Sequence, residues 1–166
     1  VLFDEIDALE KFQEKVDTFK MPVKNKPEKF GNQIIYDQED QIIGYEDQAL
    51  IIGTSITIDY TYDLVKSLNG FVFPAHIDRG SNSIISNLGF MPENLNIRTI
   101  ELSSKYNKET DIKHIDINSY CILRNSDAHR LWQISEAENS IESQEMTAQS
   151  ILEALKQSKC HNKGDK

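Results

Sequence analysis

The chain has 166 residues, of which 39% are hydrophobic and 27% are charged, so its composition excludes both an intrinsically disordered chain and a membrane protein. Its net charge of −9 disfavours a protein that binds nucleic acid through a broad basic surface, because such binding needs many lysine and arginine contacts. The length fits one domain but is short for a complete α/β barrel.

The amino-terminal third of the chain predicts a helix followed by a hairpin. Apolar residues at steps of three and four, with acids in the first turn, predict an amphipathic helix over residues 6–19. Pro22 ends this helix, and a polar loop follows. Two short apolar runs, at residues 33–36 and 41–43, flank an acidic turn and predict a small β-hairpin excursion near residues 33–43.

From residue 49 onward, short apolar runs alternate with amphipathic stretches. This alternation predicts βα units and a mainly parallel sheet, and therefore an α/β fold. The predicted strands cover residues 49–52, 71–74, 97–102 and 120–123. The predicted helices cover residues 61–68, residues 83–88 and a last segment that Thr147 caps. We expect residues 1–166 to form a single domain that ends in a polar tail at residues 159–166.

The two cysteines and the amino terminus bear on the cellular compartment. Cys121 and Cys160 form neither a CxxC pair nor the dense pattern of a secreted scaffold, so we expect reduced thiols in a cytoplasmic protein. The amino terminus shows no charged segment followed by an apolar run, so the sequence gives no indication of a signal peptide. A chain that opens on Val1 rather than Met suggests that residues upstream were removed.

Two polar segments, residues 73–79 and 124–129, directly follow predicted strands. In a parallel α/β sheet, side chains just beyond the carboxyl ends of the strands converge on one site. Asp127 and His129 are two residues apart, so an extended backbone points both to one side, where carboxylate and imidazole can bind a metal. For this pair alone, the alternative is that Asp127 caps the turn and His129 hydrogen-bonds to it. For His76 alone, the alternative is a hydrogen-bonded histidine at a strand end. The two motifs together favour the metal site.

Ala75-His76 at one strand end and Ser126-Asp127-Ala128-His129 at another resemble, in the same order, the later motifs of the PHP family, which is named for polymerase and histidinol phosphatase. The resemblance extends to a bacterial branch of PHP phosphoesterases and covers the chain up to about Ile134. The further segments that carry it are Lys24-Asn25-Lys26-Pro27, Phe30-Gly31-Asn32-Gln33, Ala75-His76-Ile77-Asp78-Arg79 and Leu88-Gly89-Phe90.

The resemblance implies a distorted barrel of about seven βα units with two or three divalent metal ions, Zn, Mn or Fe, at its carboxyl-terminal mouth. We therefore expect this chain to be the second half of a (β/α)7 PHP barrel. The implied metal ligands are His76, Asp127 and His129. Glu101 is a further candidate ligand, with an ordinary surface acid as the alternative. Arg79 is a candidate for binding substrate phosphate, and its alternative is a surface ion pair with Asp78 or another acid.

The implied activity is hydrolysis of a phosphomonoester, a nucleotide or a nucleic-acid end by metal-activated water. In that reaction Asp127 and His129 serve as catalytic metal ligands, and nucleic acid is a partner only as a substrate. Because the attacking group is water, Ser126 is assigned to shaping the turn rather than to covalent chemistry.

The first two motifs of the family, a His-x-His and an acid–histidine pair, have no counterpart here, because the remaining histidines are His114 and His161. We therefore expect the chain to supply part of a metal site and to be inactive alone. Exposed sheet edges would favour pairing with a missing amino-terminal half or self-association, unless the chain is a portion of a longer protein. The alternative function is a catalytically inactive PHP remnant that acts as a binding or assembly module.

Overall fold

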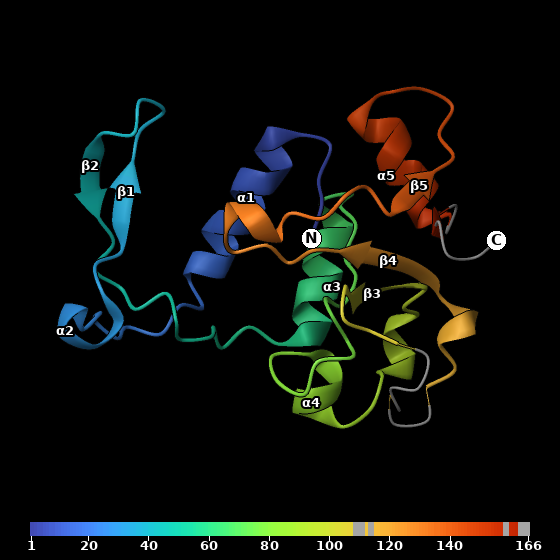
Figure 1. Ribbon diagram of the computed structural model, residues 1–166, viewed down its shortest axis with the longest axis horizontal. Helices are drawn as coiled ribbons and strands as arrows, with labels where there is room; N and C mark the ends of the chain where they lie inside the picture. Colours follow the sequence, from blue (N-terminus) through green and yellow to red (C-terminus); the bar gives the residue numbers. More distant parts are fainter. Residues whose placement is uncertain (108–111, 113–114, 158–159, 163–166) are drawn as a thin grey trace.

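The computed structural model describes residues 1–107, 112, 115–157 and 160–162 (Figure 1). The α-helices in this part of the chain are α1 (Ile6–Asp17), α2 (Pro27–Phe30), α3 (Ile58–Ser67), α4 (Ile84–Leu88) and α5 (Ala148–Lys156). The strands are β1 (Ile34–Tyr36), β2 (Ile42–Tyr45), β3 (Thr99–Ser103), β4 (Cys121–Asn125), β5 (Asn139–Ile141) and β6 (Cys160–Asn162). Short 3₁₀ helices are η1 (Glu93–Leu95), η2 (Ile117–Ser119) and η3 (Leu131–Gln133).

The strands do not build a barrel. Over the described residues they form three two-stranded sheets: antiparallel β1–β2, parallel β3–β4 and antiparallel β5–β6. The expected second half of a (β/α)7 barrel is therefore wrong. One predicted strand, residues 49–52, is a largely solvent-exposed turn, because a short apolar run that pairs with no neighbouring strand does not form a strand. Another, residues 71–74, keeps a single bridge between Leu2 and Phe71, and Pro74 has no N–H to extend it.

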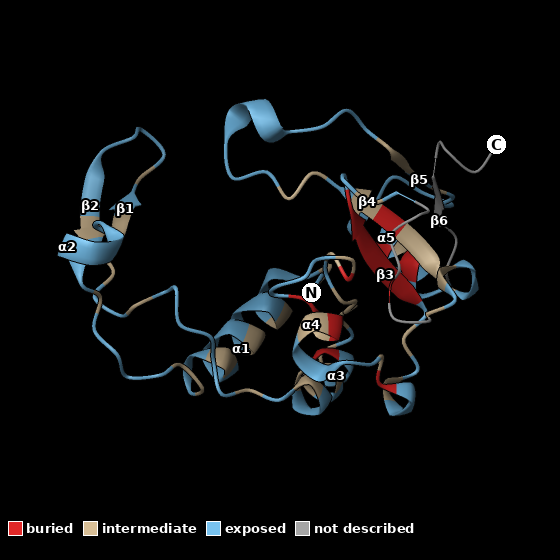
Figure 2. Cartoon of the chain, turned by 60° about the horizontal axis from the view of Figure 1, so that its bottom comes forward, coloured by how far each residue is buried: buried red, intermediate tan, exposed pale blue. Residues whose placement is uncertain are grey.

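Strand β3 lies at the centre of the best-packed part of the molecule, and all five of its residues are buried (Figure 2). On one side it pairs in parallel with β4, from Thr99 opposite Cys121 to Ser103 opposite Asn125. On its other side the backbone of Glu101 donates to Pro74 O at 3.0 Å and accepts from the N–H of Ile77 at 2.9 Å. The predicted parallel arrangement therefore exists locally, although no barrel follows from it.

The hydrophobic core against β3 fixes the loop that follows residue 74. Ile77 and Ile85 pack with Ile100 and Leu102 of β3 in one buried cluster. Helix α4 carries Ile85 and begins with a capping box in which the hydroxyls of Ser83 and Ser86 accept from each other's backbone N–H groups. The loop of residues 75–83 is therefore held at one end by its packing against β3 and at the other by the cap of α4.

Several predictions for individual elements are confirmed. Helices α1, α3, α4 and α5 occupy the expected segments, the Thr147 side chain caps α5 by accepting from Ser150 N–H, and β1 and β2 form the expected hairpin. Gly89 ends α4 in a left-handed conformation, with φ of 85°. The hairpin and α2 lie together at one end of the molecule, away from β3 and β4 (Figure 1).

Two further expectations concern the carboxyl-terminal region and the cysteines. Part of the segment expected to be a polar tail forms β6, which pairs with β5. Cys121 is disulfide-bonded, so the expectation of a reduced thiol is wrong for this residue. Within the described ranges, each helix is too short or too polar to cross a bilayer.

Candidate functional site

The two motifs identified in the sequence lie side by side at the carboxyl ends of the parallel strands. We name residues 75–79 the first motif loop and residues 125–129 the second motif loop. They are joined by an ion pair between Arg79 Nη1 and Asp127 Oδ2 at 2.7 Å. Both side chains are only partly exposed, 42% for Arg79 and 27% for Asp127. The alternative considered for Arg79, an ion pair with an acid, is therefore present in the structure, and Asp127 is the partner.

Glu101 on β3 connects the same two loops from below. Only 8% of this residue is exposed, so the alternative of an ordinary surface acid is wrong. One carboxylate oxygen accepts from the backbone N–H of His76 at 3.2 Å, and the other accepts from the side-chain amide of Asn125 at 2.7 Å. A carboxylate that accepts such bonds from two segments holds them in a fixed relation.

His76 carries two marks of a functional position. Its φ of 31° lies in a region that residues with a Cβ seldom occupy, and such conformations persist where the surroundings enforce them. Its ring atom Nδ1 is buried without a hydrogen-bond partner in the described part of the chain. Buried polar atoms normally have a partner, so a nitrogen left in this state suits a metal ion or a bound ligand.

In the second motif loop the histidine is exposed and held by local contacts. His129 Nδ1 lies 2.9 Å from the backbone oxygen of Asp127, and its backbone N–H donates to the side chain of Gln133 at 2.9 Å. Because a carbonyl oxygen only accepts, Nδ1 must carry the proton of this bond, which leaves Nε2 of a neutral ring with a free electron pair. The hydrogen-bonded alternative for His129 is thus realised at one ring nitrogen, while the other remains available to a metal.

The residues present suit a metal in type. Imidazole nitrogens and carboxylate oxygens are ligands for Zn, Mn and Fe, and His76 Nδ1 has no hydrogen-bond partner among the described residues. Asp127 would first have to release Arg79. Over the ranges that the structure describes, no group of three His, Cys, Asp or Glu side chains is placed to hold a metal ion. His114 lies outside those ranges, and nothing is described of the His161 side chain.

Two supporting residues were not recognised from the sequence. Asp78 was considered only as an ion-pair partner of Arg79, but it accepts hydrogen bonds from the backbone N–H of Ser103 at 2.7 Å and from the Ser103 hydroxyl at 2.5 Å. Asn139 bonds to both backbone groups of Arg124, at 2.7 and 2.8 Å. Asp78 thereby fixes the first motif loop to the end of β3, and Asn139 fixes the end of β4. No sequence pattern marks these long-range contacts.

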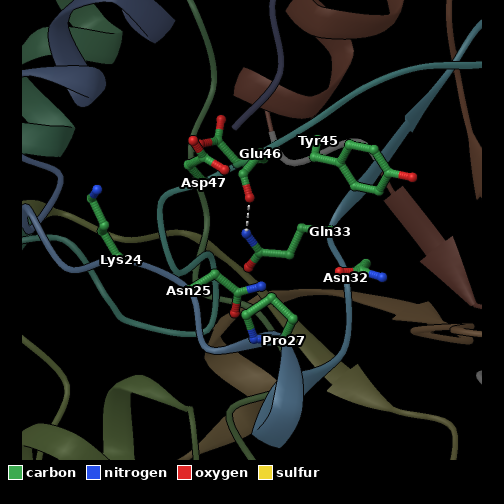
Figure 3. A pocket seen from close by; sticks show the side chains of 8 residues that line it. All are labelled: Lys24, Asn25, Pro27, Asn32, Gln33, Tyr45, Glu46 and Asp47. Atoms are coloured by element: carbon green, nitrogen blue, oxygen red, sulfur yellow. Dashed lines mark hydrogen bonds between the residues drawn. The ribbon is translucent and has the colours of Figure 1, made fainter.

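A cavity of about 530 Å³ beside the hairpin involves none of the predicted site residues (Figure 3). The Gln33 side chain crosses it, donating to Glu46 O at 2.7 Å and to Gln48 O at 2.6 Å, and accepting from Leu50 N–H. Asn25 donates to Gly31 O at 2.9 Å. The amino-terminal segments that resemble PHP phosphoesterases therefore have a structural use here, because they tie the hairpin to its neighbouring loops.

The comparisons with known proteins bear on the second motif loop. Residues 116–160, which include β4, the second motif loop and α5, match the model of the family described as PHP-associated. Asp127 and His129 fall inside the matched segment, whereas His76, Arg79 and Glu101 precede it. No curated protein and no solved structure matches the chain significantly. The segment from 116 to 160 is thus consistent with a C-terminal part of a PHP family protein, as the motif resemblance had indicated.

Proposed function

We propose that this chain supplies part of the metal and substrate site of a metal-dependent phosphoesterase, which hydrolyses a phosphomonoester, a nucleotide or a nucleic-acid end. The observation that carries the proposal is the ion pair of Arg79 with Asp127. It brings a phosphate-binding type of side chain and a metal-binding type of side chain together at the carboxyl ends of β3 and β4.

Each residue has a distinct role in this proposal. His76 through Nδ1, His129 through Nε2 and Asp127 through its carboxylate hold Zn, Mn or Fe, with two or three ions in a complete site. A bound metal supplies a water of lowered pKa and offsets charge on the phosphoryl oxygens.

The first motif loop and β3 supply the remaining roles. Arg79 exchanges the Asp127 carboxylate for substrate phosphate, which suits its planar fork of donors. Glu101 positions the two motif loops and is a further candidate ligand.

The proposal is tested by measuring the content of bound metal and the rate of hydrolysis of a generic phosphate ester, for the purified chain and for its variants. We expect Asp127→Ala, His129→Ala and His76→Ala each to lower the content of Mn, Zn or Fe by about tenfold or more, because each removes a ligand. Glu39→Gln, an exposed acid on the hairpin turn, is the matched control and should change nothing. Unchanged metal content in all three ligand variants would refute the assignment.

The second candidate function is a catalytically inactive PHP remnant that acts as a binding or assembly module. It is favoured by the pairing of Asp127 with Arg79, because this ion pair already satisfies the carboxylate that the enzyme would need as a ligand. The coding DNA upstream of Val1 separates the two proposals. An in-frame or neighbouring His-x-His segment supports the enzyme, and a native start codon without such a neighbour supports the module.

The compartment is a separate prediction. The cytoplasmic location was predicted from reduced thiols, and the disulfide at Cys121 removes that argument, because cytoplasmic reductants keep most thiols reduced. Alkylation of free thiols in freshly lysed cells, followed by mass spectrometry of the peptides that contain Cys121 and Cys160, tests it. Full alkylation of both cysteines would support a reducing compartment.

A further inference from the structure

A second cavity, of about 530 Å³, lies at the opposite end of β3 from the two motif loops. Its walls include Thr99, the first residue of β3, whereas the motif loops lie beyond the last residues of the parallel strands. The carboxyl-terminal turns of α3 and α5 contribute Lys66 and Lys156. We name this space the amino-end cavity. No residue of either motif loop lines it, so its chemistry is independent of the proposed phosphoesterase.

The charge of the amino-end cavity is opposite to that of the whole chain. Three cations, Lys66, Arg98 and Lys156, line it against a single acid, Asp63, in a protein whose net charge is −9. Across the described residues, neither Lys66 nor Arg98 takes part in an ion pair. A cleft with walls of one charge sign attracts counter-ions, so these walls favour an anion.

One of the three cations is already held in place. Lys156 Nζ donates to the backbone oxygen of Asn69 at 2.6 Å, which fixes the ammonium group at the wall of the cavity. An ammonium group has three N–H donors, so two remain for a ligand. A cation ordered in this way loses less side-chain entropy when a ligand binds.

Two buried hydroxyls in the walls have no hydrogen-bond partner in the described part of the chain. They are Thr99 Oγ1, on a residue that is only 2% exposed, and Tyr62 Oη. Leaving a buried hydroxyl unpaired costs stability, so such groups normally meet a partner. Burial also raises the pKa of Tyr62 well above its ordinary value, so its hydroxyl stays protonated and can donate.

We propose that the amino-end cavity binds a small organic phosphate. Arg98 and the two lysines hold the negative charge, and the hydroxyls of Thr99 and Tyr62 donate to phosphate oxygens. The guanidinium fork suits two phosphate oxygens at once, and the lysines act as point charges. The apolar side chains of Phe71, Val72 and Leu95 also line the space and can contact the organic moiety.

Isothermal titration of the metal-free 166-residue chain with adenosine 5′-monophosphate tests the charge side of the proposal. We expect saturable binding that Arg98→Gln weakens by about tenfold or more, because a charge-assisted contact to phosphate is lost. Arg130→Gln, at an exposed cation stacked on Trp132, is the matched control and should bind as the wild type does. Inorganic phosphate should compete with the nucleotide.

The hydroxyl side is tested by Thr99→Val, which keeps the shape of the side chain and removes its unpaired oxygen. We expect the unliganded variant to be as stable as the wild type or more stable, because an unsatisfied buried group is gone. Its affinity for the nucleotide should nevertheless fall several-fold. Unchanged affinity in both Arg98→Gln and Thr99→Val would overturn the proposal. The absence of saturable binding at millimolar nucleotide would also overturn it.

Discussion

At the scale of single residues, Glu101 gives the sharpest test of how the two motif loops are held. Its two carboxylate oxygens accept separate bonds, one from His76 N–H and one from the Asn125 amide. In Glu101→Gln one carboxylate oxygen becomes an NH₂ group. This new donor then faces another donor, either the His76 N–H or the Asn125 amide. Asn125 cannot turn over freely, because its oxygen accepts from Asn139. We expect a loss of about 1–3 kcal/mol in the free energy of unfolding, measured in urea.

The matched control for this variant is Glu136→Gln. Glu136 is exposed and lies outside both motif loops. Its substitution should change the free energy of unfolding by less than about 0.5 kcal/mol. Equal stability of the Glu101 variant and this control would show that the two bonds to Glu101 do not hold the loops.

Tyr62 makes a prediction about alkaline pH. Burial raises the pKa of Tyr62 in the folded chain above its ordinary value of 10.0, so the folded state keeps the proton after the unfolded state has lost it. The contribution of this protonated hydroxyl to the free energy of unfolding is fully present below pH 10.0 and is lost as the pH rises above that value. In Tyr62→Phe this loss should be absent. Urea midpoints of both proteins at neutral and alkaline pH measure the difference, and parallel pH profiles would contradict the prediction.

The sequence could nominate site residues but not their contacts. His76, Asp127 and His129 stood out because metal-ligating residue types follow predicted strands. That Arg79 pairs with Asp127, and that Glu101 is buried between the loops, depends on contacts between segments more than twenty residues apart. A single sequence carries no local signal for such contacts.

At the scale of elements, Gly70 shows how tightly α3 packs against the start of the chain. A Cβ at this position would lie 2.5 Å from the ring of Phe3 and 2.8 Å from Val65. We expect Gly70→Ala to destabilise the fold by about 1–3 kcal/mol, since a buried neighbour must move. Thermal unfolding measures this loss. Gly53→Ala, where a Cβ meets nothing within 4 Å, should leave the melting temperature almost unchanged. Similar melting temperatures for the two variants would refute the packing argument.

The helices were more predictable than the strands, for a physical reason. Helices α1, α3, α4 and α5 are set by local signals such as apolar spacing, the Ser83 and Thr147 caps and the left-handed Gly89. A strand also needs a neighbour to bond with, which no short window reveals. Residues 49–52 have the composition of a strand yet lie in a turn. The barrel was inferred from family resemblance. The described residues form three separate sheets instead, so the resemblance did not predict the architecture.

At the scale of the whole molecule, apolar surface next to the second motif loop predicts self-association. Leu131, Trp132 and Ile134 are 85%, 75% and 65% exposed, and they lie within four consecutive residues. Exposed apolar patches normally mark an interaction surface. We expect concentration-dependent association in sedimentation velocity, reduced in the double variant Leu131→Ser and Trp132→Ser. Met146→Ser, at an isolated and fully accessible position, should associate as the wild type does.

The burial of β3 also affects how the molecule exchanges hydrogen with its solvent. A strand that is covered on both faces and bonded along both edges can release its amide protons to water only when the surrounding structure opens. Deuterium uptake at residues 99–103 should therefore be the slowest in the chain and should follow global opening. The exposed hairpin, by contrast, should take up deuterium early. The difference in uptake between the hairpin and β3 therefore separates local opening from global unfolding within one experiment.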